Sequence, residues 1–247
     1  MSNRTIKNPT GSVGMHFMNL GDRLPVEYTM ALGQLNETNW NVIRLAGGHK
    51  ELQETPDEIY QFFIDVFKGY NGILFSGGTR SLKGENDFGF MITEVAAKIR
   101  EANSSNQIQI LGSFPRTGQP GLVGQSSFMV NEWEAANPTY DRLLMVQKDP
   151  TKTLDWNGDL PEYFNAMNIW RKAGAKTGIT CYNGGDVSYE EGVLAIKNNH
   201  PLFLVRGSGR RCEELVREFQ GRPGVWVAEL GKPETLRNGL LKFGLLR

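Results

Sequence analysis

The stretch GITCYNGGDVSYEEGVLAIKN, residues 178–198, shows the pattern on which the whole chain is built. Residues 178–182 form a short apolar run that predicts a strand, and residues 188–198 have the spacing of a helix. Asn-Gly-Gly, residues 183–185, stands between them. A strand that ends in a glycine-rich turn and leads into a helix is the repeating unit of parallel α/β sheets.

The same unit recurs on both sides of this stretch. Helices are expected to begin near residues 55, 91, 161, 188 and 211 and after Pro233. The expected strands are 42–46, 72–75, 107–111, 143–146, 178–182, 201–205 and 225–227. This alternation predicts an α/β fold, a Rossmann-like doubly wound and mostly parallel sheet of about seven strands with helices on both faces.

Two regions fall outside the alternation. Residues 1–40 are rich in Gly, Asn and Thr with little periodicity, so we expect an N-terminal lead-in segment that is extended or loosely helical. Residues 113–138 form a long stretch with Gly and Pro, which is typical of a lid or binding loop. The remainder, residues 41–247, is expected to form a single domain.

Composition excludes several classes of function. Lys plus Arg and Asp plus Glu each number 27, so we expect no nucleic-acid partner and no attraction to an anionic membrane. No window approaches 18 uninterrupted apolar residues, which argues against a membrane span. Cys181 and Cys212 fit reduced core thiols of a cytoplasmic protein. The three histidines are scattered, so we expect no metal site and no bound cofactor.

Glycine clusters follow three of the predicted strands and precede helices. They are SGGT at 76–79, NGGDVS at 183–188 and GSGRR at 207–211. In a doubly wound sheet these positions are the carboxyl ends of parallel strands, where such folds bind ligands. Bare backbone amides and a helix N-terminus favour a phosphate there. The motifs GxxxxGK[ST] and GxGxxG are absent, so the clusters match neither common nucleotide fingerprint.

One cluster carries a family resemblance. GGDVSYEE, residues 184–191, resembles the PGGxGTxxE motif of the SLOG superfamily, which includes the LONELY GUY phosphoribohydrolases. Gly184, Gly185 and Glu191 match the motif. Ser188 replaces its Thr, while Asn183 and Val187 stand where Pro and the third Gly are usual.

Two further segments extend this resemblance over most of the chain. ILFSGGTRSLKGENDFGFMITEVA, residues 73–96, resembles the earlier glycine-rich turn of the superfamily, including Gly89 at the following helix start. NHPLFLVRGSGRRCEELV, residues 199–216, is similar to the third element of the LSDAT branch, whose members include the N-terminal domain of melastatin-type TRP channels. The resemblance implies a domain that binds a nucleotide-derived small molecule such as ADP-ribose, a cyclic ADP-ribose isomer or an NAD-related compound.

The resemblance also implies the site residues. Gly77, Gly78 and Thr79 would line one phosphate, and Gly184, Gly185 and the start of the next helix would hold a second phosphate or the ribose. Arg210 could clamp a phosphate through its guanidinium, with Arg80 and Arg206 either as second contacts or as solvated charges. The full set of expected ligand-binding residues is Gly77, Gly78, Thr79, Arg80, Gly89, Asn183, Gly184, Gly185, Asp186, Ser188, Glu191, Gly207, Ser208, Gly209 and Arg210.

Two of these residues have a second interpretation. Ser188 with Glu191 three residues later reads as a capping box, which starts a helix without any ligand. Glu191 could alternatively accept hydrogen bonds from ribose hydroxyls.

Two classes of function follow, and a third is weaker. The first is a sensor or sequestering module, with output through a homo-oligomer or a separate partner. The second is a nucleotide N-glycosidase in which Arg171 holds a 5′-phosphate and Glu191 stabilises an oxocarbenium ion. The third is a domain that only oligomerises, with Trp133 and Trp156 as interface anchors or as lid residues over a base.

Overall fold

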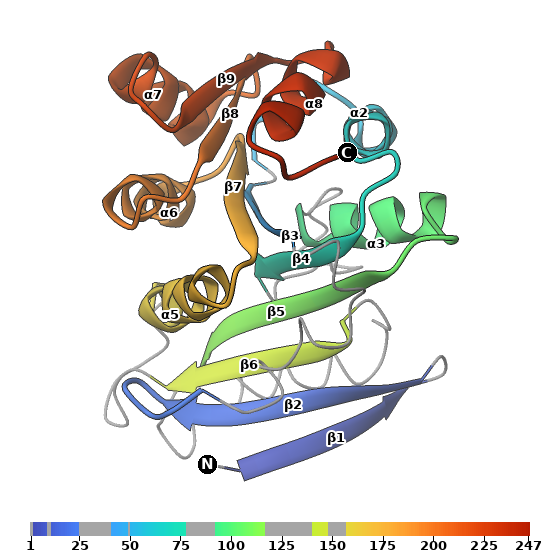
Figure 1. Ribbon diagram of the computed structural model, residues 1–247, viewed down its shortest axis with the longest axis vertical. Helices are drawn as coiled ribbons and strands as arrows, with labels where there is room; N and C mark the ends of the chain where they lie inside the picture. The colour runs from blue at the N-terminus through green and yellow to red at the C-terminus, as the bar shows by residue number, and fades with distance from the viewer. Residues whose placement is uncertain are drawn as a thin grey trace.

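The computed structural model describes residues 2–8, 11–24, 41–48, 50–77, 92–116, 140–147 and 157–247. These residues form one sheet with helices on both of its faces (Figure 1). The strands are β1 (Ser2–Asn8), β2 (Gly11–Asn19), β3 (Asn41–Gly47), β4 (Gly72–Gly77), β5 (Ile108–Arg116), β6 (Arg142–Gln147), β7 (Lys176–Tyr182), β8 (Leu202–Arg206) and β9 (Val225–Glu229). The helices are α2 (Pro56–Val66), α3 (Ile92–Ala102), α5 (Leu160–Lys172), α6 (Asp186–Lys197), α7 (Arg210–Phe219) and α8 (Pro233–Lys242).

The strand order is β1-β2-β6-β5-β4-β3-β7-β8-β9, and every neighbouring pair runs parallel except β1 and β2. The segment β5-β4-β3-β7-β8-β9 is a parallel core of six strands in the 3-2-1-4-5-6 order of the doubly wound fold. The predicted α/β class is therefore confirmed. The predicted strand count is corrected, because this core of six is extended by β6, β2 and β1 to nine.

The N-terminal region differs from the lead-in segment that the sequence predicts. Residues Ser2–Asn8 and Gly11–Asn19 are strands β1 and β2, and β2 pairs with β6 along residues Gly14 to Asn19. Strands β1 and β2 pair antiparallel with Asn8 opposite Gly11, and the sequence Asn8-Pro9-Thr10-Gly11 has a composition typical of turns. Strand β5 also continues to Arg116, so the expected loop at 113–138 begins inside a strand.

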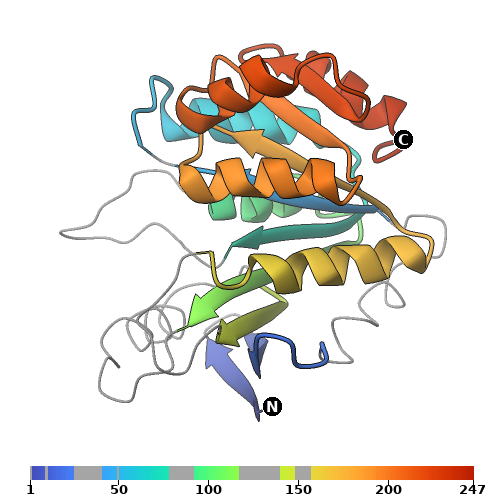
Figure 2. The ribbon, with the colours of Figure 1, turned by 90° about the vertical axis from the view of Figure 1, so that its left-hand side faces the viewer.

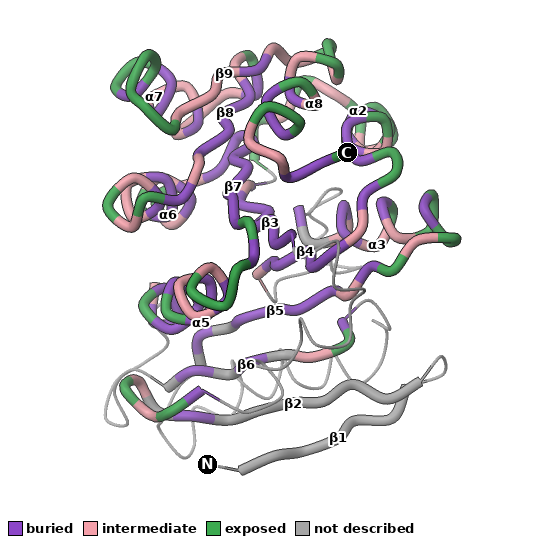
Figure 3. The backbone as a smooth tube through the Cα atoms, viewed as in Figure 1, coloured by how far each residue is buried: buried purple, intermediate pink, exposed green. Residues whose placement is uncertain are grey.

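Two apolar clusters hold the helices onto the sheet. One cluster lies under α2, α3 and α8, and the other lies under α5, α6 and α7, which cover the face turned toward the viewer in Figure 2. The central strands are buried along most of their length (Figure 3). Cys181 and Cys212 are free, buried thiols in the second cluster, as the composition predicts.

Helix α2 begins where the sequence predicts. The Thr55 hydroxyl accepts from the Glu58 backbone N–H at 3.3 Å, and the Thr55 N–H donates to the Glu58 carboxylate at 2.8 Å. Pro56 occupies the first turn. This reciprocal capping box fixes the start of the helix, so that Phe62 and Phe63 fall on its buried face.

His200 links the core to the pH dependence of stability. Its Nδ1 lies 2.8 Å from the Thr177 hydroxyl, and burial, followed by the charge of Arg171, lowers the pKa of His200 to about 4. The unfolded chain binds this proton more strongly, so the contribution of His200 to stability is lost as pH decreases from 6.5 to 4, by roughly 2 to 3 kcal/mol. Urea unfolding should show that His200→Gln gains stability relative to the native chain between pH 7 and pH 4.5. Equal slopes would contradict this.

Candidate functional site

The topological switch point of the sheet lies between β3 and β7. From β3 the chain moves to β4 on one side, and from β7 it moves to β8 on the other. Ligands of doubly wound folds bind outside the carboxyl ends of the strands at this point. Here those ends carry Gly47-Gly48 after β3 and Asn183-Gly184-Gly185 after β7. The predicted cluster around Asn183 therefore lies at the switch point, and Gly47-Gly48 belongs beside it.

Some of these glycines are required by the chain itself. The Gly48 N–H donates to the Tyr182 carbonyl at 3.3 Å, and a Cβ on Gly48 would lie 2.9 Å from the Gly184 α-carbon. Gly184 has a φ of 80°, and a Cβ there would lie 2.7 Å from the Ser188 hydroxyl oxygen. Gly48 and Gly184 thus allow two turns to pack closely. This packing alone explains why glycine stands at both positions, without a ligand.

Asn183 ties three of the turns together. Its N–H donates to the Ser208 hydroxyl at 2.8 Å, and its side-chain amide donates to the carbonyls of Ser208 at 2.9 Å and Lys50 at 3.1 Å. In return, the Asn183 carbonyl accepts from the Cys212 N–H at 2.9 Å. The two predicted site residues Asn183 and Ser208 are therefore buried links between the turns after β3, β7 and β8.

Helices α6 and α7 begin without side-chain caps. Their N-cap residues are Gly185 and Gly209, and neither helix start has a side-chain cap hydrogen bond. The predicted capping box of Ser188 and Glu191 is wrong, because α6 begins at Asp186 and Ser188 is already inside its first turn. The first N–H groups of α6 are therefore not taken by a capping side chain, which suits an anion.

Arg210 stands at the start of α6 although it belongs to α7. Its guanidinium lies against Gly185, with Nη2 3.4 Å from the position of a Cβ on that glycine. Arg210 has a φ of 49°, a conformation unusual for a residue other than glycine. Within the part of the chain that the structure describes, its guanidinium makes no hydrogen bond or ion pair. A half-buried cation thus faces an uncapped helix start.

The neighbouring charges at this edge are paired. Arg211 binds Asp186 at 2.7 Å and also binds Glu214. Arg206 binds Glu229 at 2.9 Å, and its side chain is 42% exposed, which fits the interpretation of Arg206 as a solvated charge. The Gly207 N–H donates to the Glu213 carboxylate. Of the predicted arginines that the structure describes, Arg210 is therefore the one that is available to a ligand.

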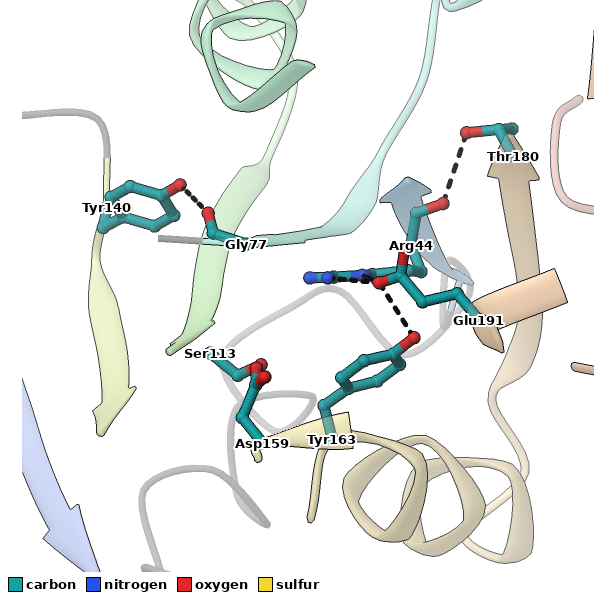
Figure 4. A network of polar contacts seen from close by, with 8 residues as sticks. All are labelled: Arg44, Gly77, Ser113, Tyr140, Asp159, Tyr163, Thr180 and Glu191. Carbon is teal, nitrogen blue, oxygen red and sulfur yellow. Dashed lines mark hydrogen bonds and ion pairs between the residues drawn. The ribbon is translucent and has the colours of Figure 1, made fainter. Parts of the chain in front are cut away.

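Glu191 does not face the glycine turns. Its Oε1 accepts from Nε of Arg44 at 3.0 Å, from Nη2 of Arg44, and from the Tyr163 hydroxyl at 2.9 Å (Figure 4). The Arg44 and Glu191 side chains are only 6% and 3% exposed. Burial lowers the pKa of Arg44, but the ion pair with Glu191 more than offsets this and the net pKa is raised. The motif glutamate therefore anchors α6 to β3 and α5.

A second acidic group lies next to this pair. Asp159 precedes α5, is buried, and accepts from the hydroxyl of Ser113, which lies within β5. Burial raises the pKa of Asp159 to about 6, against the opposing effects of Ser113 and Arg44. The Tyr140 hydroxyl donates to the Gly77 carbonyl close by (Figure 4). Sequence reasoning missed Arg44, Asp159 and Tyr163, although a charged residue inside the apolar run VIRLA was a visible signal.

Arg171 lies far from the glycine turns. It ends α5 and donates to the carbonyls of Asn198 at 2.6 Å and Asn199 at 2.9 Å, beyond the end of α6. The rise of an α-helix puts Asn198 about 10 Å from Glu191 and about 20 Å from Gly185 along α6. The structure thus does not bring together the two residues of the expected hydrolase.

Several predicted residues lie outside the described part of the chain. They are Gly78, Thr79, Arg80, Gly89, Trp133 and Trp156.

Among the residues that are described, no group of three or more His, Cys, Asp or Glu side chains could hold a metal ion. None of the described helices has the length and apolar character needed to cross a membrane. A groove of about 460 Å³ runs between α5 and α6, lined by residues such as Asn157, Asn168 and Leu194 rather than by the glycine turns.

The strand order, the helices on both faces and the glycine turns at the switch point define a Rossmann-like, doubly wound α/β protein. No protein-family model matches the sequence, and no curated protein is similar to it in sequence. Among solved structures, the Moco carrier protein from Chlamydomonas reinhardtii is similar to this chain with a TM-score of 0.45 and 16% sequence identity. The match covers 82% of this chain and 98% of that one.

Proposed function

We propose that the chain binds a phosphate-bearing, nucleotide-derived small molecule at the carboxyl ends of β3, β7 and β8. The observation that carries this proposal is the Arg210 guanidinium, which has no protein partner among the described residues and lies against the uncapped start of α6. An arginine and free helix N–H groups together form a site for a phosphate. The paired carboxylates nearby would not compete, because Arg211 neutralises Asp186.

The resemblance to the SLOG superfamily, which stays a prediction, narrows the ligand to ADP-ribose, a cyclic ADP-ribose isomer or an NAD-related compound. The chain would then act as a sensor or a sequestering module. Assembly into a homo-oligomer is part of the same prediction, and light scattering with and without ADP-ribose measures it.

Arg210 supplies the test of the phosphate site. Titration calorimetry with ADP-ribose, cyclic ADP-ribose isomers, NAD, AMP and ribose 5-phosphate should identify at least one ligand of the native chain. We expect Arg210→Ala to weaken its binding about tenfold to a hundredfold, because a hydrogen-bonded charge is lost. Arg217→Ala, at an exposed position of the same helix α7, is the matched control. Absence of any binding, or an equal loss in both variants, would overturn the proposal.

A further inference from the structure

Gly77, two strands away from Arg210's site, lies beside several polar side chains of the described residues. Gly77 ends β4 and pairs in register with Ser113 of β5, whose hydroxyl donates to Asp159. A Cβ built on Gly77 would have one neighbour within 4 Å among the described residues, Nη2 of Arg44 at 3.8 Å. Figure 4 shows the Arg44 guanidinium pointing between Gly77 and the Ser113–Asp159 pair. We call Arg44, Gly77, Ser113 and Asp159 the Gly77 subsite.

The subsite contains an unsatisfied donor. Nε and Nη2 of Arg44 both bind Glu191, but Nη1 is buried and has no hydrogen-bond partner among the described residues. A buried donor left unpaired is costly, and most such groups in native proteins are satisfied by protein, water or a ligand. Nη1 of Arg44 therefore marks a position for an acceptor atom.

The charges of the subsite determine which acceptor fits. Arg44 and Glu191 compensate each other, and Asp159, which is hydrogen-bonded to Ser113, adds a second carboxyl group near Arg44. A phosphate here would face two carboxylates, and an ammonium group would face the guanidinium, so both are disfavoured in a buried site. A neutral group with a carbonyl oxygen for Arg44 and an N–H for Asp159 satisfies both partners.

We propose that the Gly77 subsite binds a carboxamide or lactam group of the ligand, with its carbonyl oxygen on Arg44 and its N–H on the Asp159 carboxyl. This proposal rests on the proposed function, because it places the other end of the same ligand. Strands in a sheet are about 4.8 Å apart, so the end of β4 lies roughly 10 Å from the end of β7, across β3. A nucleoside phosphate with an amide-bearing base spans such a distance, and a free phosphate does not.

The test compares four probes by titration calorimetry with the full chain. Nicotinamide mononucleotide and inosine 5′-monophosphate carry the carbonyl and N–H. Nicotinic acid mononucleotide replaces the carboxamide with a carboxylate of similar size, and ribose 5-phosphate lacks a base. We expect at least one amide-bearing probe to bind at least about tenfold more tightly than both controls. This gain in affinity is what one hydrogen bond to a charged group contributes.

Two variants locate that gain in the subsite. Gly77→Val fills the space while leaving the polar groups in place, and Asp159→Leu removes the acceptor. Each should lower the affinity for the amide-bearing probe to that of ribose 5-phosphate, whose binding depends on Arg210. Asp65→Leu on the exposed side of α2 is the matched control and should change neither. Thermal unfolding verifies that each variant is folded, and Gly77→Ala replaces Gly77→Val if the latter is not.

The outcomes separate the two proposals. If ribose 5-phosphate binds in an Arg210-dependent manner but neither amide-bearing probe gains affinity, the subsite is refuted and the phosphate site stands. The subsite is also refuted if the gain survives Gly77→Val and Asp159→Leu. If none of the four probes binds, the subsite is refuted, and the titrations with ADP-ribose, cyclic ADP-ribose isomers, NAD and AMP decide the phosphate site.

Discussion

Glu191→Ala is expected to lower the free energy of unfolding by about 3–5 kcal/mol. The substitution leaves the Arg44 guanidinium buried with its main counter-charge removed, and the Tyr163 hydroxyl loses its acceptor. Since folded proteins are stable by only about 5–15 kcal/mol, this is a large share of the total. Urea unfolding at pH 7 gives the difference directly.

Two further variants test whether the ion pair itself is responsible. Arg44→Met/Glu191→Leu removes both charges, and it should recover most of the lost stability because apolar residues of similar volume replace a buried pair at little cost. Glu229→Ala removes one partner of an exposed Arg–Glu pair, with both side chains 42% exposed, and should cost less than about 1 kcal/mol. If Glu191→Ala behaves like Glu229→Ala, the buried pair is not a stabilising anchor.

This result bears on any functional test at Glu191. The family motif suggests a glutamate that contacts ribose, and loss of binding in Glu191→Ala would ordinarily be taken as support. The structure assigns Glu191 to the packing of α5 and α6 on β3, so such a loss has to be corrected for the unfolded fraction. Arg210→Ala is the cleaner probe, because its guanidinium supports no other described residue.

The fold was predictable because its signals are local. Helix α2 shows its capping box and its apolar face within a dozen residues, and the glycine turn after β7 separates an apolar strand from a helix. Such signals fix element type and order, from which the parallel sheet follows. Strand β1 was missed because Ile6 is its only apolar residue. Strand β2 does show an apolar alternation at Val13, Met15 and Phe17, but its pairing with β1 and β6 leaves no local signal.

The candidate site was predictable only in part because its contacts are not local. Arg210 was identified from its position after a glycine turn, and the structure places it at the start of α6. Arg44 and Glu191 are separated by 147 positions along the chain, so their pairing leaves no local trace. The position of Glu191 in the motif predicts contact with a ligand. In the structure Glu191 lies in the second turn of α6, on the side that faces the sheet.

Asp159→Asn is expected to stabilise the protein at pH 7.5 by roughly 2 to 3 kcal/mol. The pKa of Asp159 is raised from its ordinary 3.8 to about 6, mainly by burial. The folded state therefore holds this proton more strongly than the unfolded state, and stability is lost as pH rises from about 4 through 6. Asparagine has no such charge, so the gain should be full above pH 7, shrink below pH 6 and vanish near pH 4.

Urea unfolding of both chains at pH 7.5, 6 and 4.5 gives this profile. Asp65→Asn on exposed α2 is the control and should stay within about 0.5 kcal/mol at each pH. His200 acts in the opposite direction, because its lowered pKa removes stability as pH falls over nearly the same interval. The free energy of unfolding of the native chain should therefore depend less on pH than that of either single variant. A gain from Asp159→Asn that is independent of pH would contradict a buried Asp159 that titrates in this range. A buried carboxyl group that lowers stability at the start of α5 fits a role in ligand binding, where an amide N–H would stabilise its charged form.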